Sequence, residues 1–120
     1  MATILGVGID LVEINRAKRL IKQNRRFLKQ FLSPKEYLIV QKSRHKTKAF
    51  GLLFAAKEAV SKAMGISIQS PRAFADYIMY IKDGKLCCNF FRKGHKTKHT
   101  FILWPFEETT HLGVVAFKVS

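Results

Sequence analysis

One helix is the strongest element that the sequence predicts, and it reads KAFGLLFAAKEAVSKAMG over residues 48–65. We expect it to begin at Thr47 or Lys48 and to end at Met64, because Gly65 readily adopts the left-handed conformation that ends helices. Four alanines in its second half favour a helix and leave room for another backbone to approach closely. These alanines are Ala55, Ala56, Ala59 and Ala63.

Two more helices are predicted before this one. Residues 13–23 place apolar side chains at helical spacing, with basic side chains elsewhere around the helix. Ser33 suits a helix N-cap, because proline follows it and Glu36 stands three residues on, as in a capping box. We therefore expect a further helix over residues 34–42.

The remaining segments predict strands. Residues 3–9 form a short apolar run that is typical of a buried strand. Residues 77–81 lead into Asp83-Gly84, a sequence typical of a hairpin turn, and residues 86–91 then form the return strand. The predicted architecture is one α+β domain over residues 1–120, with an antiparallel sheet packed against the long central helix. The last two predicted strands are residues 100–104 and 113–119.

Composition excludes several classes of protein. The chain has 120 residues and a formal charge of +14, and its 48% hydrophobic content is too high for a disordered basic tail. No apolar stretch is long enough to cross a membrane, and we expect no secretory leader. The adjacent Cys87 and Cys88 do not suit a disulfide framework, so we expect a reduced, cytoplasmic protein. Residues 15–48 contain twelve Lys and Arg but one acid, which favours an anionic partner.

Two carboxylates are candidates for chemistry. Asp10 follows the predicted first strand and is either a helix cap or a ligand. Glu58 lies four residues before Lys62 on one helix face, and it forms either an ordinary surface ion pair or a half-buried site that needs a partner. Together Asp10 and Glu58 offer the oxygen ligands that suit Mg²⁺. Lys57 and Lys62 would then hold phosphate oxygens.

These residues lie in stretches that resemble holo-[acyl-carrier-protein] synthase, the small bacterial class of 4′-phosphopantetheinyl transferases. The most specific stretch is FAAKEAVSKA at residues 54–63, because ten ordered residues in register rarely arise by chance. The resemblance is strong over residues 4–66 and extends over the remainder in outline. The other matching stretches are GIDLVEI at residues 8–14 with Arg16, Arg26-Phe27, and FLS at residues 31–33 with Glu36.

The resemblance implies a reaction in fatty acid and lipid metabolism. Phosphopantetheine passes from coenzyme A to a serine of apo acyl carrier protein, with Mg²⁺ as cofactor and 3′,5′-ADP as product. Asp10 and Glu58 would hold the metal and, with Lys62, form the catalytic group. The family assembles as a homotrimer with active sites between subunits, so we expect the same here. The residues implied to contact coenzyme A are Lys57, Ser61, Lys62 and Gly65.

The resemblance also implies a docking surface for the carrier protein. A carrier protein is strongly acidic, and the basic excess of this chain falls in the same segment as the implied surface. Complementary charges of this kind speed encounter and weaken with salt. The implied docking residues are Arg16, Leu20, Arg25, Arg26 and Phe27.

The chain departs from the family pattern in four places. Leu53 stands where arginine is usual, Leu86 stands where proline is usual, and the turn after the long helix has lost glycines. Residues 101–105 lack the family's Ser-x-Ser/Thr-His stretch. Two alternatives therefore stay open. One is a family member that binds carrier protein with weakened catalysis, and the other is a basic module that binds nucleic acid, although no recognised nucleic-acid motif is present.

Overall fold

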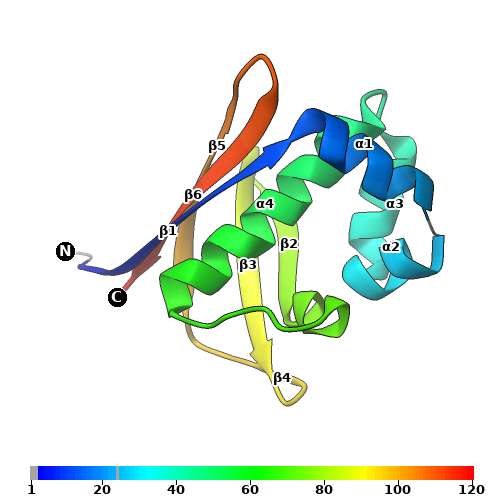
Figure 1. The fold of residues 1–120 in the computed structure, drawn as a ribbon. Helices are drawn as coiled ribbons and strands as arrows, with labels where there is room; N and C mark the ends of the chain where they lie inside the picture. The colour runs from blue at the N-terminus through cyan, green and yellow to red at the C-terminus, as the bar shows by residue number, and fades with distance from the viewer. Residues whose placement is uncertain (1–2, 24) are drawn as a thin grey trace.

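A long helix, α4 (Lys46–Met64), lies against two small antiparallel sheets in the computed structural model, which describes residues 3–23 and 25–120 (Figure 1). The helix has 19 residues and ends at Gly65, whose φ of 71° lies in the left-handed region. The predicted helix and its glycine stop are therefore confirmed. No helix among the described residues is long and apolar enough to cross a membrane.

The N-terminal helices cover one end of α4 (Figure 1). The capping box is confirmed, because the Glu36 N–H donates to Ser33 Oγ at 3.2 Å and the Ser33 N–H donates to Glu36 Oε1 at 2.7 Å. One helix, α2, was not predicted. It is too short for its own propensity to hold it, and it forms because Leu28 and Phe31 pack into the core. The bounds are α1 (Ile14–Gln23), α2 (Arg25–Phe31) and α3 (Pro34–Lys42), with a 3₁₀ helix, η1 (Pro71–Asp76), after α4.

The strands form two three-stranded sheets with orders β1-β6-β5 and β2-β3-β4. The α+β class and the antiparallel pairing are confirmed, but the strands do not form the single sheet that we expected. The hairpin at Asp83-Gly84 is confirmed, with φ values of 52° and 72° that suit its tight turn. The bounds are β1 (Ile4–Glu13), β2 (Tyr77–Lys82), β3 (Lys85–Arg92), β4 (His95–Lys96), β5 (Thr100–Glu107) and β6 (His111–Val119).

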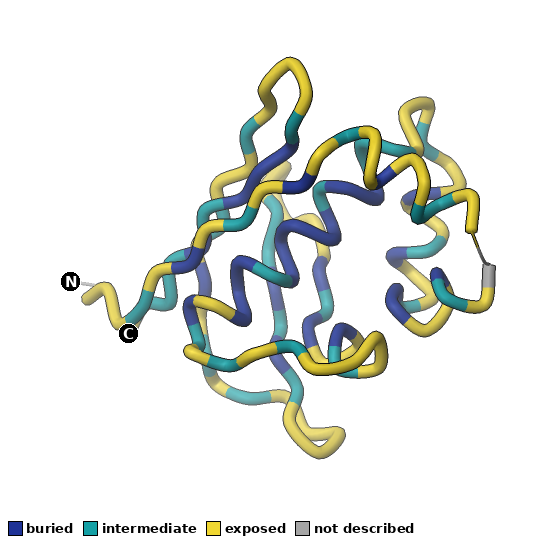
Figure 2. Tube along the Cα trace, viewed as in Figure 1, coloured by how far each residue is buried: buried dark blue, intermediate teal, exposed yellow. Residues whose placement is uncertain are grey.

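The first strand differs from its prediction in length and in burial. It continues to Glu13, because β6 pairs with it along most of its length. Asp10 therefore pairs with Val114 inside the strand, and the alternative that it caps a helix is wrong. Only the face toward α4 is covered, so Gly8 is buried whereas Ile9 is 52% exposed (Figure 2).

The core lies around α4, and most of this helix is buried (Figure 2). An aromatic cluster fills the space between α2, α4 and η1. The centre of the Phe31 ring lies 4.2 Å from the centre of the Phe74 ring and 5.3 Å from that of Phe54. On its other side α4 approaches β1 closely at Gly8. A Cβ atom at Gly8 would lie 2.6 Å from the Ala63 nitrogen and closer still to the Ala59 carbonyl oxygen. This contact sets the distance between β1 and α4.

Candidate functional site

Three predicted catalytic residues lie together between β1 and α4. Lys62 Nζ donates to Asp10 Oδ1 at 2.9 Å and to the Ile9 carbonyl oxygen at 3.1 Å. Glu58 lies one helical turn before Lys62, on the same face of α4. The structure therefore brings a strand carboxylate to a carboxylate and a lysine of α4, although Asp10 lies 52 residues before Lys62 in the sequence.

Strand alternation explains how Asp10 reaches this point. Side chains two residues apart lie on the same face of a strand, so Gly8 and Asp10 share the face that packs on α4. Gly8 has no side chain, and this lets the strand approach the helix closely enough for Asp10 to meet Lys62. The Asp10 side chain is 14% exposed and the Lys62 side chain is 51% exposed. The site is therefore open to solvent on the lysine side.

The two carboxyl groups are in an environment that disfavours their charged forms. Burial raises the pKa of Asp10, while the hydrogen bond and charge of Lys62 and the charge of Arg16 act to lower it. Burial also raises the pKa of Glu58, and the neighbouring charge of Asp10 raises it further. Two carboxylates that repel each other in a partly buried place are stabilised by an added cation.

The raised pKa of Glu58 predicts how stability depends on pH. The folded state binds this proton more tightly than the unfolded state, so ionisation of Glu58 destabilises the fold. Glu58→Gln cannot ionise, so we expect it to be more stable than the original chain above the raised pKa. The gain should disappear as the pH falls below 4.5, the ordinary pKa of a glutamate side chain.

Urea unfolding at a series of pH values measures this difference. Glu108→Gln is the matched control, because Glu108 is an exposed carboxylate whose removal should give no comparable gain. A Glu58→Gln protein no more stable than the original chain at neutral pH would contradict the prediction.

The carboxylate pair suits Mg²⁺ better than a metal that needs a full protein cage. Among the described residues, no group of three or more His, Cys, Asp or Glu side chains is arranged to hold a metal ion. Mg²⁺ usually takes one or two protein carboxylates and completes its shell with water and substrate phosphate. Asp10 and Glu58 fit that pattern in ligand type, in their closeness and in their mutual repulsion.

Arg16 lies at the edge of this site. Its guanidinium carbon is 5.6 Å from the centre of the Phe54 ring, and its charge acts to lower the pKa of both Asp10 and Glu58. Sequence reasoning assigned Arg16 to carrier docking alone, because the helical pattern of residues 13–23 does not reveal what the helix faces. The structure places the Arg16 charge beside the carboxylate pair as well.

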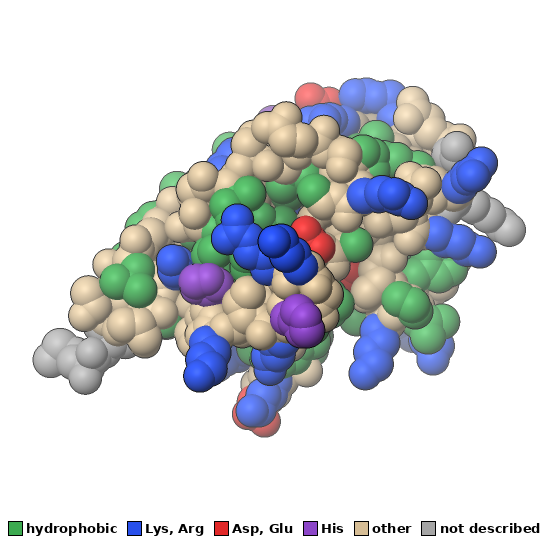
Figure 3. All heavy atoms as spheres, turned by 90° about the horizontal axis from the view of Figure 1, so that it is seen from below, with side chains coloured by type: hydrophobic (Ala, Val, Ile, Leu, Met, Phe, Trp, Pro, Cys, Tyr) green, Lys and Arg blue, Asp and Glu red, His purple; other side chains and the backbone are tan. Residues whose placement is uncertain are grey.

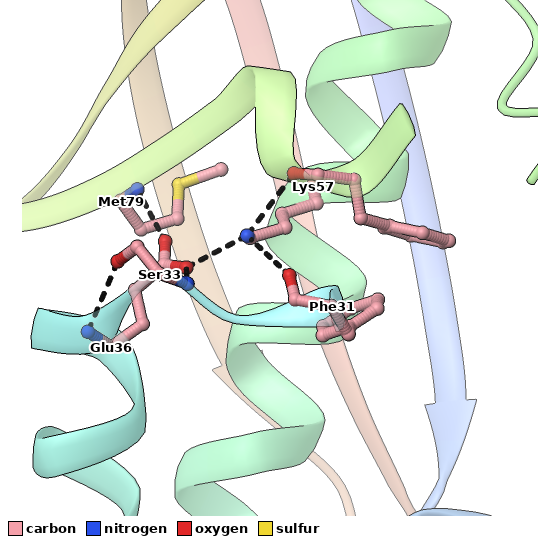
Figure 4. A network of polar contacts seen from close by, with 6 residues as sticks. Phe31, Ser33, Glu36, Lys57 and Met79 are labelled. Carbon is pink, nitrogen blue, oxygen red and sulfur yellow. Dashed lines mark hydrogen bonds and ion pairs between the residues drawn. The ribbon is translucent and has the colours of Figure 1, made fainter. Parts of the chain in front are cut away.

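The prediction that Lys57 contacts coenzyme A is wrong. The Lys57 side chain is fully buried among α2, α3 and η1 (Figure 4). It projects from α4 about 100° around the helix axis from its neighbour Glu58. Its ammonium donates to the carbonyl oxygens of Phe31, at 2.9 Å, and Phe74, at 3.1 Å, and it forms an ion pair with Glu36 at 2.7 Å. All three of its donors are satisfied inside the protein, so none remains for a phosphate.

Helical spacing contained a signal for this placement. Leu53, Val60 and Ser61 lie three or four residues from Lys57, and all are buried, so Lys57 lies on the packed face of α4. Ser61 requires the same correction, because it is buried and its hydroxyl donates to the Glu58 carbonyl oxygen at 2.7 Å. Gly65 is exposed at the end of α4, three residues beyond Lys62, and its contact with coenzyme A stays a prediction.

The predicted docking residues lie on α1 and α2. Leu20 and Phe27 are partly buried, and Phe27 stacks on the core residue Phe31 at 6.1 Å. Arg26 is exposed. The side chain of Arg25 lies outside the part of the chain that the structure describes. Leu20 and Phe27 therefore pack within the fold and leave only part of their surface for a partner.

A second basic surface lies at the end of the molecule where β4 is found. Figure 3 shows Lys, Arg and His side chains gathered over this face. A cavity of about 510 Å³ nearby is lined by Lys96, Lys98 and His99, among others. These residues come from the β3–β5 region, whereas the predicted docking residues come from α1 and α2. The positive charge is thus distributed over two surfaces.

A model of the 4′-phosphopantetheinyl transferase superfamily matches residues 6–115. The chain belongs to this superfamily. It is 33% identical over 126 residues to the holo-[acyl-carrier-protein] synthase of Buchnera aphidicola, with 97% of this chain and 98% of that relative covered. The family predicted from the sequence is confirmed.

Other superfamily members add detail to this likeness. The chain is 42% identical over 62 residues to the holo-[acyl-carrier-protein] synthase of Clostridium acetobutylicum, and this match spans half of that relative and 52% of the chain. Among solved structures, it matches the holo-(acyl-carrier-protein) synthase of Bacillus anthracis in complex with CoA (3′,5′-ADP). The TM-score is 0.80 at 28% identity, covering 98% of this chain and 97% of the other. The predicted α+β fold is confirmed by this likeness.

Proposed function

We propose that this chain is a holo-[acyl-carrier-protein] synthase. It transfers 4′-phosphopantetheine from coenzyme A to a serine of apo acyl carrier protein in the cytoplasm, requires Mg²⁺ and releases 3′,5′-ADP. The observation that supports this most directly is the meeting of Asp10, Glu58 and Lys62 between β1 and α4. Membership of the superfamily and the names of the relatives support the same reaction.

Each residue of the site has a defined part in the proposed reaction. Asp10 and Glu58 hold Mg²⁺, which supplies positive charge beside the pyrophosphate of coenzyme A. Glu58 accepts the proton of the carrier serine, directly or through water. The serine oxygen forms a bond to the β-phosphorus in line with the bond that breaks, and 3′,5′-ADP leaves. Lys62 donates to phosphate oxygens and stabilises the negative charge that develops on them.

Carrier docking on α1 and α2 follows from charge. The helices contain exposed cations, among them Arg16 and Arg26, and a carrier protein is acidic. Arg16 lies close to the carboxylate pair, so a carrier bound there would present its serine near Glu58. Opposite charges of this kind raise the association rate more than they raise the affinity.

Intact-mass spectrometry of apo acyl carrier protein tests the proposal. The carrier is incubated with this chain, coenzyme A and Mg²⁺, with a chelator in the control reaction. A mass gain of one phosphopantetheine group that the chelator abolishes is the expected result. No gain with several carriers that still bind would favour a catalytically weakened member. No carrier binding, together with nucleic-acid affinity that falls steeply with salt, would favour the nucleic-acid alternative.

We also propose that the chain assembles as a homotrimer with active sites between subunits. Large apolar side chains project from β1 and β5 on the face that α4 does not cover, and contiguous apolar surface of this kind marks association sites. Ile9 is 52% exposed and Trp104 is 67% exposed. The other members of this apolar face are Leu5, Val7, Leu11 and Ile102, all more than half exposed.

A lysine at the centre of this apolar face is expected to break the assembly. Ile9→Lys would bury an unpaired charge in each interface, so the trimer should dissociate at micromolar concentration. Sedimentation velocity measures the size of the assembly. The fluorescence emission of Trp104, the sole tryptophan, should shift to longer wavelength as its ring becomes exposed to solvent. Leu38→Lys on α3 is the control and should leave the size unchanged. An Ile9→Lys protein with the size of the original chain would count against this interface.

A further inference from the structure

The buried ion pair between Lys57 and Glu36 has no part in the reaction described above. Both side chains are fully buried, and their charged atoms lie 2.7 Å apart (Figure 4). Glu36 also accepts from two backbone N–H groups, those of Ser33 and Met79, each at 2.7 Å. With the bonds of Lys57 to Phe31 and Phe74, the pair forms a closed network in which every buried side-chain nitrogen and oxygen has a hydrogen-bond partner.

The network connects the central helix to four other segments. Phe31 is the last residue of α2, Ser33 is the N-cap of α3, Phe74 belongs to η1 and Met79 belongs to β2. Phe31 and Phe74 accept from Lys57 itself, whereas Ser33 and Met79 donate to its partner Glu36. Lys57 lies one residue before Glu58 in α4 (Figure 4). The helix that bears two of the three proposed catalytic side chains is therefore fixed to the rest of the fold at this place.

Such a pair is a poor way to stabilise a protein. Removing two charges from water costs free energy that their attraction often does not recover, and uncharged replacements of similar size are often tolerated or even stabilising. What the pair provides is geometry, because three donors of one ammonium group point at three fixed acceptors. An apolar side chain would fill the same space without specifying the rotation of α4 or its position along its own axis.

We propose that Lys57 and Glu36 are positioning residues that set Glu58 relative to Asp10 and to the docking helix α2. This inference rests on the proposed transferase function. A rotation of α4 at Lys57 moves Glu58 with it, whereas Asp10 stays on β1. The bond from Lys57 to the Phe31 carbonyl oxygen fixes the last residue of α2 to α4. Arg26 and Phe27 lie in the first turn of α2. Small displacements of reacting groups have large effects on rate.

Two variants separate a positioning role from a merely structural one. Lys57→Met leaves Glu36 buried without its partner, so we expect a large fall in the urea midpoint. The double variant Lys57→Met/Glu36→Gln removes both charges and keeps an acceptor for the Met79 N–H. We expect it to recover the part of the urea midpoint that the unpaired Glu36 charge had cost, although the carbonyl oxygens of Phe31 and Phe74 still lack their donor. Its kcat for carrier modification should nevertheless stay about 10-fold to 100-fold lower, with little change in KM for coenzyme A.

The control is Phe101→Leu, a core change on β5 that touches none of the network residues in the contacts described above. It should lower the urea midpoint without a comparable loss of kcat. A double variant that recovers both stability and kcat would overturn the positioning role, as would one whose KM alone rises. The original chain is assayed in parallel, and its failure to modify any carrier would refute the transferase function itself. Loss of kcat in the double variant alone supports positioning.

Discussion

Replacing Asp10 with Asn is expected to lower kcat for carrier modification by about a thousandfold, because one preorganised electrostatic group at a reacting centre typically contributes that much. Asparagine keeps nearly the same shape and can still accept from Lys62, so the contact between β1 and α4 should survive. It lacks the negative charge that the proposed Mg²⁺ site requires. The loss should therefore appear in catalysis and in the dependence on metal, and not in folding.

The initial rate of carrier modification, measured by intact mass across a series of Mg²⁺ concentrations, tests this expectation. Glu13→Gln is the matched control, because Glu13 is an exposed carboxylate at the end of the same strand. Its rate should stay within about twofold of the original chain, as expected for a surface change away from the reacting groups. Circular dichroism establishes that both variants are folded. An Asp10→Asn protein that keeps most of its Mg²⁺-dependent rate would contradict the assigned site.

The parts of the fold that local sequence signals encode were predictable. Ser33, Pro34 and Glu36 form a capping box from four consecutive positions, and the structure has that box with both hydrogen bonds. Gly65 ends α4 through a backbone conformation that needs no distant partner. Such features depend on residues within one turn of each other, so they survive whatever tertiary packing surrounds them.

The features that were missed depend on distant segments. Asp10 was expected at the end of a strand, but β1 continues beyond it to Glu13. The extra residues pair with β6, which lies about a hundred residues later in the chain. Lys57 was expected at a phosphate because it is charged and adjoins Glu58. Its acceptors come from three separate segments, and no local pattern predicts that they converge on one ammonium group.

Three positions at which the chain departs from the family pattern lie close together in the fold. Leu53, Leu86 and Pro105 come from α4, β3 and β5, and in the sequence they are unrelated changes. In the structure they line one cavity of about 250 Å³, together with other apolar side chains. Leu53, Leu86 and the last residue of the altered 101–105 stretch therefore meet at one apolar cavity. It lies apart from the residues that bring Asp10, Glu58 and Lys62 together.

Replacing Gly8 with alanine is expected to destabilise the fold by about 3 kcal/mol or more, at the upper end of overpacking effects. The added Cβ would lie 2.6 Å from the Ala63 nitrogen and would overlap the Ala59 carbonyl oxygen. Both atoms belong to the backbone of α4, so no side-chain rotation relieves the overlap. The strand must move away from the helix, and the buried surface along their contact is then lost.

Urea unfolding of Gly8→Ala and Gly84→Ala separates this overlap from the general cost of replacing glycine. Gly84 has no atom within 4 Å of an added Cβ but has a φ of 72°, so its substitution costs only the strain of a left-handed residue. That strain is about 1–2 kcal/mol. Equal losses in the two variants would show that the approach of β1 to α4 is not tight.

Because Asp10 lies on the same face of β1, two residues further on, Gly8→Ala should also move Asp10 away from Lys62. Any folded fraction should therefore modify its carrier more slowly, which would connect the close approach at Gly8 to the proposed chemistry at Asp10.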